Sequence, residues 1–378
     1  MQTSHSEDIS EKALWISLST VHGLGAQTFC LLLKTFGSPA NVYAATTKQL
    51  KEVVSDKIAT AIAQGINEQA IADASQWLSN SNNHLVTLAD PHYPKALLEI
   101  TDPPPFLYAK GNLTLLSQAS IAIVGSRNAS VQGEKNAEAF AHDLCGYGLC
   151  IVSGLALGID AAAHRGALKA NGATIAVVGT GLDIVYPAKH RDLAHQIAES
   201  GLIISEFALG TPSKPQNFPK RNRIISGLSM GCLVVEANLQ SGSQITARMA
   251  AEQGREVFAI PGSIHSPMSK GCHQLIKQGA KLVDCLQDIV EDLGLSQLAL
   301  NTTTLSNITS TNDASITASQ ASSTNNSLLS IMGFEPISLE NLVRLSHLTV
   351  SEVSSMLMLL ELEGRVASLA GGQYQKIV

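Results

Sequence analysis

The sequence has no apolar run that reaches the roughly 18 residues a membrane-spanning helix needs. Its amino terminus, MQTSHSEDIS, also lacks the basic and apolar regions of a signal peptide. We therefore expect a cytoplasmic protein with no membrane contact. The cysteines fall in apolar segments without CxxC spacing, which predicts reduced core thiols and neither disulfides nor a zinc site. They are Cys30, Cys145, Cys150, Cys232, Cys272 and Cys285.

Charged side chains are scarce, at 15% of the chain, and the net charge is −6. This balance excludes a protein that coats nucleic acid with its whole surface, but it is compatible with a local basic groove. The segment 211–223, TPSKPQNFPKRNR, contains cations and no acid. Its cations are Lys214, Lys220, Arg221 and Arg223.

The common nucleotide-binding fingerprints are missing. No GK[ST] follows a glycine-rich loop, and GTGLDI at 179–184 lacks the third glycine of the dinucleotide-binding fingerprint. A lone G-x-G is weak evidence, so we expect no ATP, no NAD and no other cofactor.

The stretch that organises the chain is 121–127, IAIVGSR. Its continuous apolar, β-branched run predicts a parallel strand covered on both faces. A helix is expected from about 131 to 144, so Gly125, Ser126 and Arg127 lie between a strand's carboxyl end and a helix amino terminus. Such a turn favours anions, and an arginine adds donors that match phosphate oxygens. The alternative is a purely structural turn with a solvated arginine.

From 121 to 284, apolar strands alternate with amphipathic helices, for example 161–170 and 244–254. This order predicts an α/β domain with a doubly wound parallel sheet, whose ligands bind at the carboxyl ends of the strands. Most of the loops at these ends contain glycine and Ser or Thr. The predicted strands are 121–124, 149–152, 174–178, 202–205, 232–236, 256–260 and 281–283.

The flanking regions differ from this pattern. Residues 1–80 predict short helices with a G-x-G turn at Gly23–Gly25, typical of a helix-hairpin-helix (SAM-like) domain or of simple bundle packing. The proline-rich stretch 80–111 predicts an extended connector with short strands at 85–88 and 106–108. Residues 296–326 are rich in Ser, Thr and Asn and predict a flexible linker. Residues 327–378 predict a winged helix, whose acidic third helix favours protein contact over DNA reading.

The basic segment has both parts of a single-strand binding site, a track of cations and a ring on which a base can stack. Phe218 lies in what we expect to be a polar loop, and a base platform is preferred to a role in capping the core. Arg127, Arg221 and Arg223 would hold phosphates.

Two catalytic interpretations remain open. Asp160 and His164 are four residues apart on one predicted helix and could form an acid–base pair, but structural use is preferred, with Asp160 as the helix cap. Glu206 and Glu236 follow two strands and could serve a hydrolase that cleaves a base from a ribose phosphate. A third alternative is an adaptor that recruits a partner through its winged helix and binds DNA only incidentally.

Several motifs together resemble the DprA/Smf family of DNA-processing proteins over residues 85–290. They are GSR at 125–127, SGLALGIDAAAH at 153–164, GTGLD…YP at 179–187, FPKRNRIISGLS at 218–229, VVEANLQSGSQITAR at 234–248 and AIPG at 259–262. The resemblance implies a Rossmann-like, homodimeric, non-enzymatic protein that binds single-stranded DNA in natural transformation. It also implies that the protein protects this DNA and helps to load a RecA-type recombinase.

Carried over by motif, the DNA-contacting positions form a set drawn from four segments. They are Gly125, Ser126, Arg127, Ser153, Gly154, Lys214, Phe218, Arg221, Arg223, Ser241, Gly242 and Ser243. The alignment of Lys214 is the least secure, because it lies in a variable proline loop. The resemblance implies no catalytic residue and no metal ligand.

Overall fold

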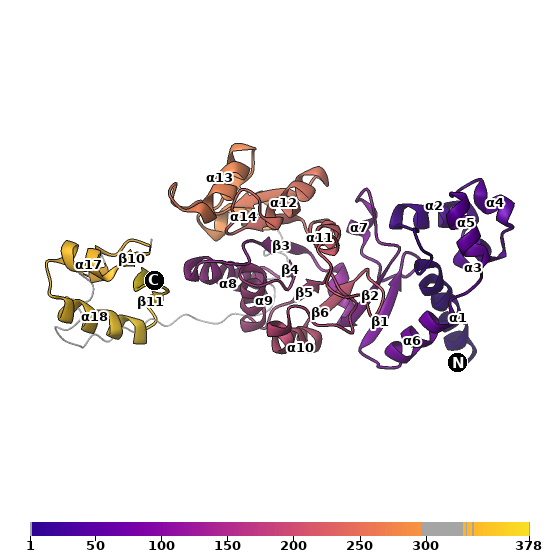
Figure 1. Ribbon diagram of the computed structural model, residues 1–378, viewed down its shortest axis with the longest axis horizontal. Coiled ribbons are helices and arrows are strands. Elements are labelled where there is room, and N and C mark those ends of the chain that lie inside the picture. The colour runs from indigo at the N-terminus through magenta and orange to yellow at the C-terminus, as the bar shows by residue number, and fades with distance from the viewer. Residues whose placement is uncertain (1, 296–327, 330, 335, 378) are drawn as a thin grey trace, which may run out of the picture. The chain divides into compact units, whose positions relative to one another are not determined.

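The centre of the protein, seen in a computed structural model, is a nine-stranded sheet in the order β1-β2-β6-β5-β4-β3-β7-β8-β9 (Figure 1). The structure describes residues 2–295, 328–329, 331–334 and 336–377. These divide into two compact units, Met1–Asn128 with Ala137–Leu295, and Ala129–Asn136 with Ser296–Val378. The predicted linker 296–326 lies outside the described residues.

The strands from β3 to β9 run parallel, as the apolar runs predicted. Crossovers go outward from β3 in both directions, so the sheet is doubly wound and the predicted α/β class is confirmed. The strands are β3 (Ser120–Val124), β4 (Cys150–Ser153), β5 (Thr174–Val177), β6 (Leu202–Ser205), β7 (Gly231–Val234), β8 (Glu256–Ala259) and β9 (Lys281–Leu282).

The proline-rich connector forms one edge of this sheet. Strand β1 (Asn83–Thr87) pairs antiparallel with β2 (Phe106–Gly111), and β2 pairs antiparallel with β6. A short helix, α7 (Lys95–Leu98), lies between them in the chain. The two predicted short strands are therefore part of the main sheet.

Helices cover both faces of the sheet (Figure 1). On one face, Ile224, Ala247 and Leu275 pack with inward residues of the strands in one large core cluster. On the other, Ala161 and Ile197 pack with Ala176 and their neighbours. The helices are α8 (Val131–Gly146), α9 (Ile159–Lys169), α10 (Arg191–Ser200), α11 (Asn217–Leu228), α12 (Gly242–Glu252), α13 (Lys270–Lys277) and α14 (Leu286–Asp292), with 3₁₀ turns η1 (Leu113–Ser117), η2 (Ala188–His190) and η3 (Pro267–Ser269).

The amino-terminal region is helical, as predicted, and its core includes Trp15, Phe29 and Leu32. The predicted G-x-G turn joins the first two helices, and Gly23 has φ +86°. The helices are α1 (Gln2–Ser19), α2 (Ala26–Phe36), α3 (Pro39–Ala44), α4 (Thr47–Lys51), α5 (Asp56–Ala63) and α6 (Glu68–Leu78).

The second unit contains the predicted winged helix. Helices α17 (Leu339–Ser346) and α18 (Val350–Leu362) pack over a sheet of β10 (Ile337–Ser338), β12 (Gln373–Lys376) and β11 (Val366–Leu369). A capping box between Thr349 and Glu352 starts α18.

None of the helices in the described part of the chain is long and apolar enough to cross a membrane. The six cysteines are free thiols, and Cys150, Cys232 and Cys272 are buried as expected. Cys285 is exposed, so the prediction that all six are core residues is wrong.

Candidate nucleic-acid interface

The loops that leave β3 and β7 meet where the strand order reverses, the usual ligand site of a doubly wound sheet. Gly125 ends β3 at this point, and a Cβ added there would lie 2.5 Å from Ile159 and 2.9 Å from the Glu236 carbonyl. Only glycine fits so close an approach. Gly158, with φ +73°, fits under the Ser126 carbonyl in the same way. The GSR turn is therefore fixed against the start of α9.

A cavity of about 400 Å³ opens at this position. Several residues of the predicted DNA-contacting set line it: Arg127, Phe218, Arg221, Gly242 and Ser243. The guanidinium carbon of Arg127 lies 5.2 Å from the centre of the Phe218 ring. Arg127 is exposed, so the structure brings an accessible cation and an aromatic ring from two distant segments onto one rim.

Phe218 and the cations after it lie on a helix, not in a loop. Helix α11 begins at Asn217, and Pro219 lies in its first turn, where a missing N–H costs no hydrogen bond. Ile224, Ile225 and Leu228 are buried at helical spacing against the sheet. The expectation of a polar loop was therefore wrong, because three prolines and four cations obscured the apolar face of the helix.

Arg221 is buried at 4% exposure beneath the cavity. Its Nη1 donates to the carbonyls of Gly154, at 2.6 Å, and Val177, and its Nε donates to the Asn222 amide oxygen at 3.2 Å. Burial lowers the pKa of Arg221 to about 10, and the nearby carboxyl of Asp160 opposes this shift. Arg221 thus fixes the 154 loop while its charge lines the cavity.

Arg223 is not available as expected. Its Nη2 lies 2.5 Å from Glu206 and its Nε lies 3.3 Å from Asp102. Arg223 and Glu206 are each 12% exposed. Burial raises the pKa of Glu206, although Arg223 opposes the shift. The structure thus places Arg223 in a largely buried ion pair that joins α11 to β6 and the connector, and its contact with phosphate stays a prediction.

Three other predicted contacts are placed differently. Ser153 is fully buried, and its hydroxyl donates to the Ile123 carbonyl at 2.6 Å, so its side chain holds two strands together. Gly154 is buried too, and a Cβ there would lie 2.6 Å from Arg221. Ser126 is 8% exposed and accepts from the Asn128 N–H at 3.1 Å. Ser153, Gly154 and Ser126 therefore hold the strands and loops that lie beneath the cavity.

The remaining predicted contacts differ in exposure: Lys214 and Gly242 are exposed, whereas Ser243 is buried. Lys214 is exposed between Ser213 and Pro215, which both line the cavity. Gly242 begins α12 at the rim, and the hydroxyls of Ser241 and Ser243 lie 2.7 Å apart. The first N–H groups of a helix have no intrahelical acceptor, so this end of α12 favours an anion.

The acid–base pair, which the sequence left open as the alternative, does not form, and structural use of both residues is what the contacts show. His164 is fully buried and its Nδ1 lies 2.7 Å from the Thr174 hydroxyl. Burial lowers the pKa of His164 to about 3. Asp160 is in the first turn of α9 and accepts from the N–H groups of Gly154 and Ala156, so it holds a loop and is not the cap. Burial raises its pKa.

Tyr186 is the aromatic residue that sequence reasoning missed. It lines the same cavity from the loop after β5 and is 45% exposed, with its ring centre 5.7 Å from that of Phe218. The YP pair at 186–187 was visible in the sequence, as an aromatic residue beyond a strand-end glycine loop. Its partner is 32 positions away, so the pairing itself was not visible.

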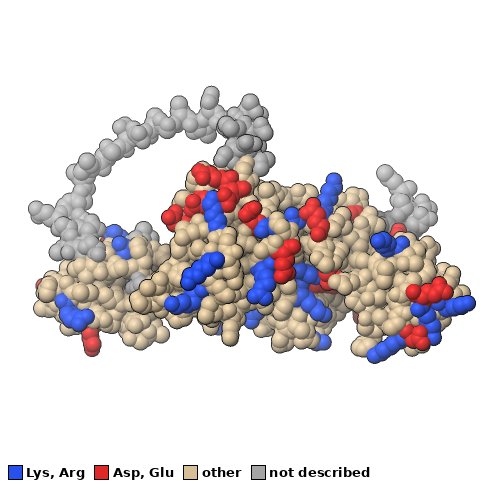
Figure 2. All heavy atoms as spheres, turned by 90° about the horizontal axis from the view of Figure 1, so that it is seen from above, with Lys and Arg blue, Asp and Glu red and all other residues tan. Residues whose placement is uncertain are grey.

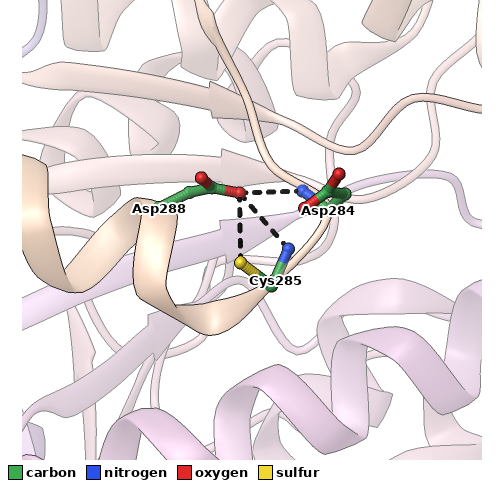
Figure 3. A group of neighbouring side chains, drawn as sticks. All are labelled: Asp284, Cys285 and Asp288. Carbon is green, nitrogen blue, oxygen red and sulfur yellow. Dashed lines mark hydrogen bonds between the residues drawn. The ribbon is translucent and has the colours of Figure 1, made fainter.

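Among the described residues, one group offers three potential metal ligands, Asp284, Cys285 and Asp288 (Figure 3). Asp288 accepts from the backbone N–H groups of Asp284, at 3.1 Å, and Cys285, at 3.3 Å. These hydrogen bonds lower its pKa. The group is the amino-terminal capping box of α14, which accounts for the geometry without an ion. Elsewhere, the face drawn in Figure 2 mixes charges of both signs.

Comparisons with known proteins agree with this arrangement. The family model described as DNA recombination-mediator protein A matches residues 84–294, and the DprA winged helix domain matches 313–372. Protein Smf of Escherichia coli (strain K12) is 42% identical over 305 residues, covering 80% of each chain. DNA processing protein DprA of Streptococcus pneumoniae is 50% identical over 206 residues, 54% of this chain and 73% of the relative.

Two solved structures are also similar. The X-ray structure of DNA processing protein A (DprA) from Streptococcus pneumoniae has a TM-score of 0.66 and 39% identity, and covers 75% of this chain and 97% of its own. A structure of DNA processing protein A from Helicobacter pylori, described by its single-stranded DNA binding mode, has a TM-score of 0.51 and 31% identity. It covers 58% of this chain and 97% of its own.

Proposed function

Because this chain belongs to the DNA recombination-mediator protein A (DprA/Smf) family, we propose that it binds single-stranded DNA along the rim of the cavity between β3 and β7. The Helicobacter pylori relative is described by its single-stranded DNA binding mode, which supports the proposal. The single observation that carries it is the approach of Arg127 to the Phe218 ring, 5.2 Å from guanidinium to ring centre. A cation beside aromatic side chains marks a place where a phosphate contact and a stacked base can lie next to each other.

The exposure of each side chain decides which of the predicted residues can reach a phosphate. Arg127, Lys214 and Gly242 are exposed at the rim, whereas Arg221 is buried below it and Arg223 is paired with acids. In the proposal, Arg127, Lys214 and the α12 amino terminus at Gly242 hold phosphates, and Arg221 supplies charge from beneath. Ser153, Gly154 and Ser126 keep the loops in place.

The biological role is part of the same proposal. The protein binds incoming single strands during natural transformation in the cytoplasm, protects them as a homodimer and helps to load a RecA-type recombinase. No turnover is proposed, because Glu206, one of the two carboxylates that a hydrolase would use beside Glu236, is largely buried and paired with Arg223. Release of free base from nucleoside monophosphates by the purified protein would contradict this.

The proposal is tested by fluorescence anisotropy with labelled oligo(dT) and with a duplex of equal length, over a range of salt concentrations. We expect preference for the single strand and a log–log salt slope that falls by about 0.7 in Arg127→Ala, because one phosphate contact is lost. Arg248→Ala is the matched control, since Arg248 is exposed on α12 and lines a different cavity. A wild-type slope in Arg127→Ala would remove Arg127 from the track.

A further inference from the structure

Tyr186 is held on a loop that the fold fixes firmly. The Asp183 carboxylate accepts from the Gly210 N–H, with both oxygens 2.9 Å away. The Thr180 hydroxyl donates to the Ile184 carbonyl at 3.0 Å. After Tyr186, the His190 Nδ1 lies 3.0 Å from the Leu155 carbonyl. Because the loop is held both before and after Tyr186, the position of this residue is set before any ligand arrives.

The two rings of the cavity differ in what already contacts them. Phe218 has Arg127 at 5.2 Å, Arg221 at 5.9 Å and Tyr186 at 5.7 Å from its ring centre. It also packs against Gly179, where an added Cβ would lie 3.1 Å from the ring. Tyr186 is 45% exposed, and its ring is tilted by 36° to that of Phe218. The accessible aromatic surface therefore belongs mainly to Tyr186.

We propose that a nucleobase of the bound single strand stacks on Tyr186, and that Phe218 supports this ring from behind and orients Arg127. The inference rests on the proposed function and adds a base-contacting residue to it. Stacking suits any base, because every base has a π-face, so this contact adds affinity without sequence preference. A Tyr186 that only covered Phe218 could be replaced by another apolar residue without loss of binding.

The test compares three substitutions at 186 in the full-length protein. We expect Tyr186→Phe to bind oligo(dT) within about twofold of wild type, because the ring remains. Tyr186→Leu should bind about 5- to 100-fold more weakly, as expected for one lost stacking contact, with an unchanged salt slope. Tyr147→Leu is the control, since Tyr147 is 37% exposed but precedes β4, at the opposite ends of the strands.

Tyr186→Trp gives a readout that a structural role would not change. The two native tryptophans, Trp15 and Trp77, lie in the amino-terminal helices, so added quenching on oligo(dT) binding reports on position 186. The inference is overturned if Tyr186→Leu binds oligo(dT) as tightly as the wild-type protein, or if Tyr186→Trp shows no added quenching. In either case, binding by the wild-type protein still upholds the proposed function. Failure of the wild-type protein to bind oligo(dT) overturns both.

Discussion

Arg223 is expected to stabilise the fold and not to contact DNA, and its replacement separates the two roles. In Arg223→Met, most of the side-chain volume remains but Glu206 and Asp102 lose their partner. Glu206 is 12% exposed, whereas Asp102 is 34% exposed and keeps some contact with water. Removing one partner of a buried ion pair costs about 3–5 kcal/mol, and we expect about 3 kcal/mol here because Asp102 is partly solvated.

The measurement is the free energy of unfolding by urea at pH 7. Arg127→Met is the matched control, because Arg127 is exposed and its contact with Phe218 is worth only about 0.5–1 kcal/mol. The double variant Arg223→Met/Glu206→Gln should regain part of the lost stability, since it no longer buries an unpaired carboxylate.

For DNA binding we expect the opposite ranking of the two variants, with the larger effect in Arg127→Met. Below its unfolding transition, Arg223→Met should keep the wild-type salt slope for oligo(dT), whereas Arg127→Met should lose about 0.7 from it. The reasoning is refuted if Arg223→Met is as stable as wild type and lowers the slope by that amount. Arg223 would then be the phosphate contact that the sequence suggested.

Two further predictions concern the ring and the buried histidine. Phe218→Leu should weaken oligo(dT) binding by about 1–3 kcal/mol in an anisotropy titration, because the cavity loses the ring that supports Tyr186 and Arg127. Unchanged binding would contradict this supporting role. Burial holds the pKa of His164 at about 3, below its ordinary 6.5, so the unfolded chain binds more protons between these values. The contribution of neutral His164 to the free energy of unfolding is therefore complete above pH 6.5. It should fall as the pH drops towards 3, by at most about 1.4 kcal/mol per pH unit. In urea unfolding measured from pH 7 to pH 4, His164→Gln should lack this pH-dependent contribution.

The strands were predictable because the signal lies within each segment. Runs such as 121–124 and 202–204 are continuous and apolar, which is enough to indicate a strand buried on both faces. The carboxyl-end loops then followed from topology, and with them the meeting of Arg127 and Phe218. Helix α11 was missed because proline and charge are read as loop signals, although Ile224, Ile225 and Leu228 keep helical spacing.

The contacts that each cation makes were not predictable in the same way. Arg223 pairs with Asp102, which is 121 positions away, and Arg221 donates to Gly154, 67 positions away. Within the sequence the two arginines look alike, since both lie in a segment without acids. Only the packing of α11 on the sheet decides which side chain meets a carboxylate and which meets the cavity.

The contacts of these cations limit how many phosphates of a single strand the site can hold. Of the four cations in 211–223, Arg221 is committed to loop carbonyls and Arg223 to acids, so Lys214 and Lys220 remain exposed. With Arg127, an acidic molecule then presents three exposed cations from these segments. Three contacts correspond to a salt slope of only about 2 on a single strand. Stacking on the aromatic rings must therefore supply much of the affinity, which explains why rings and cations gather at the same rim.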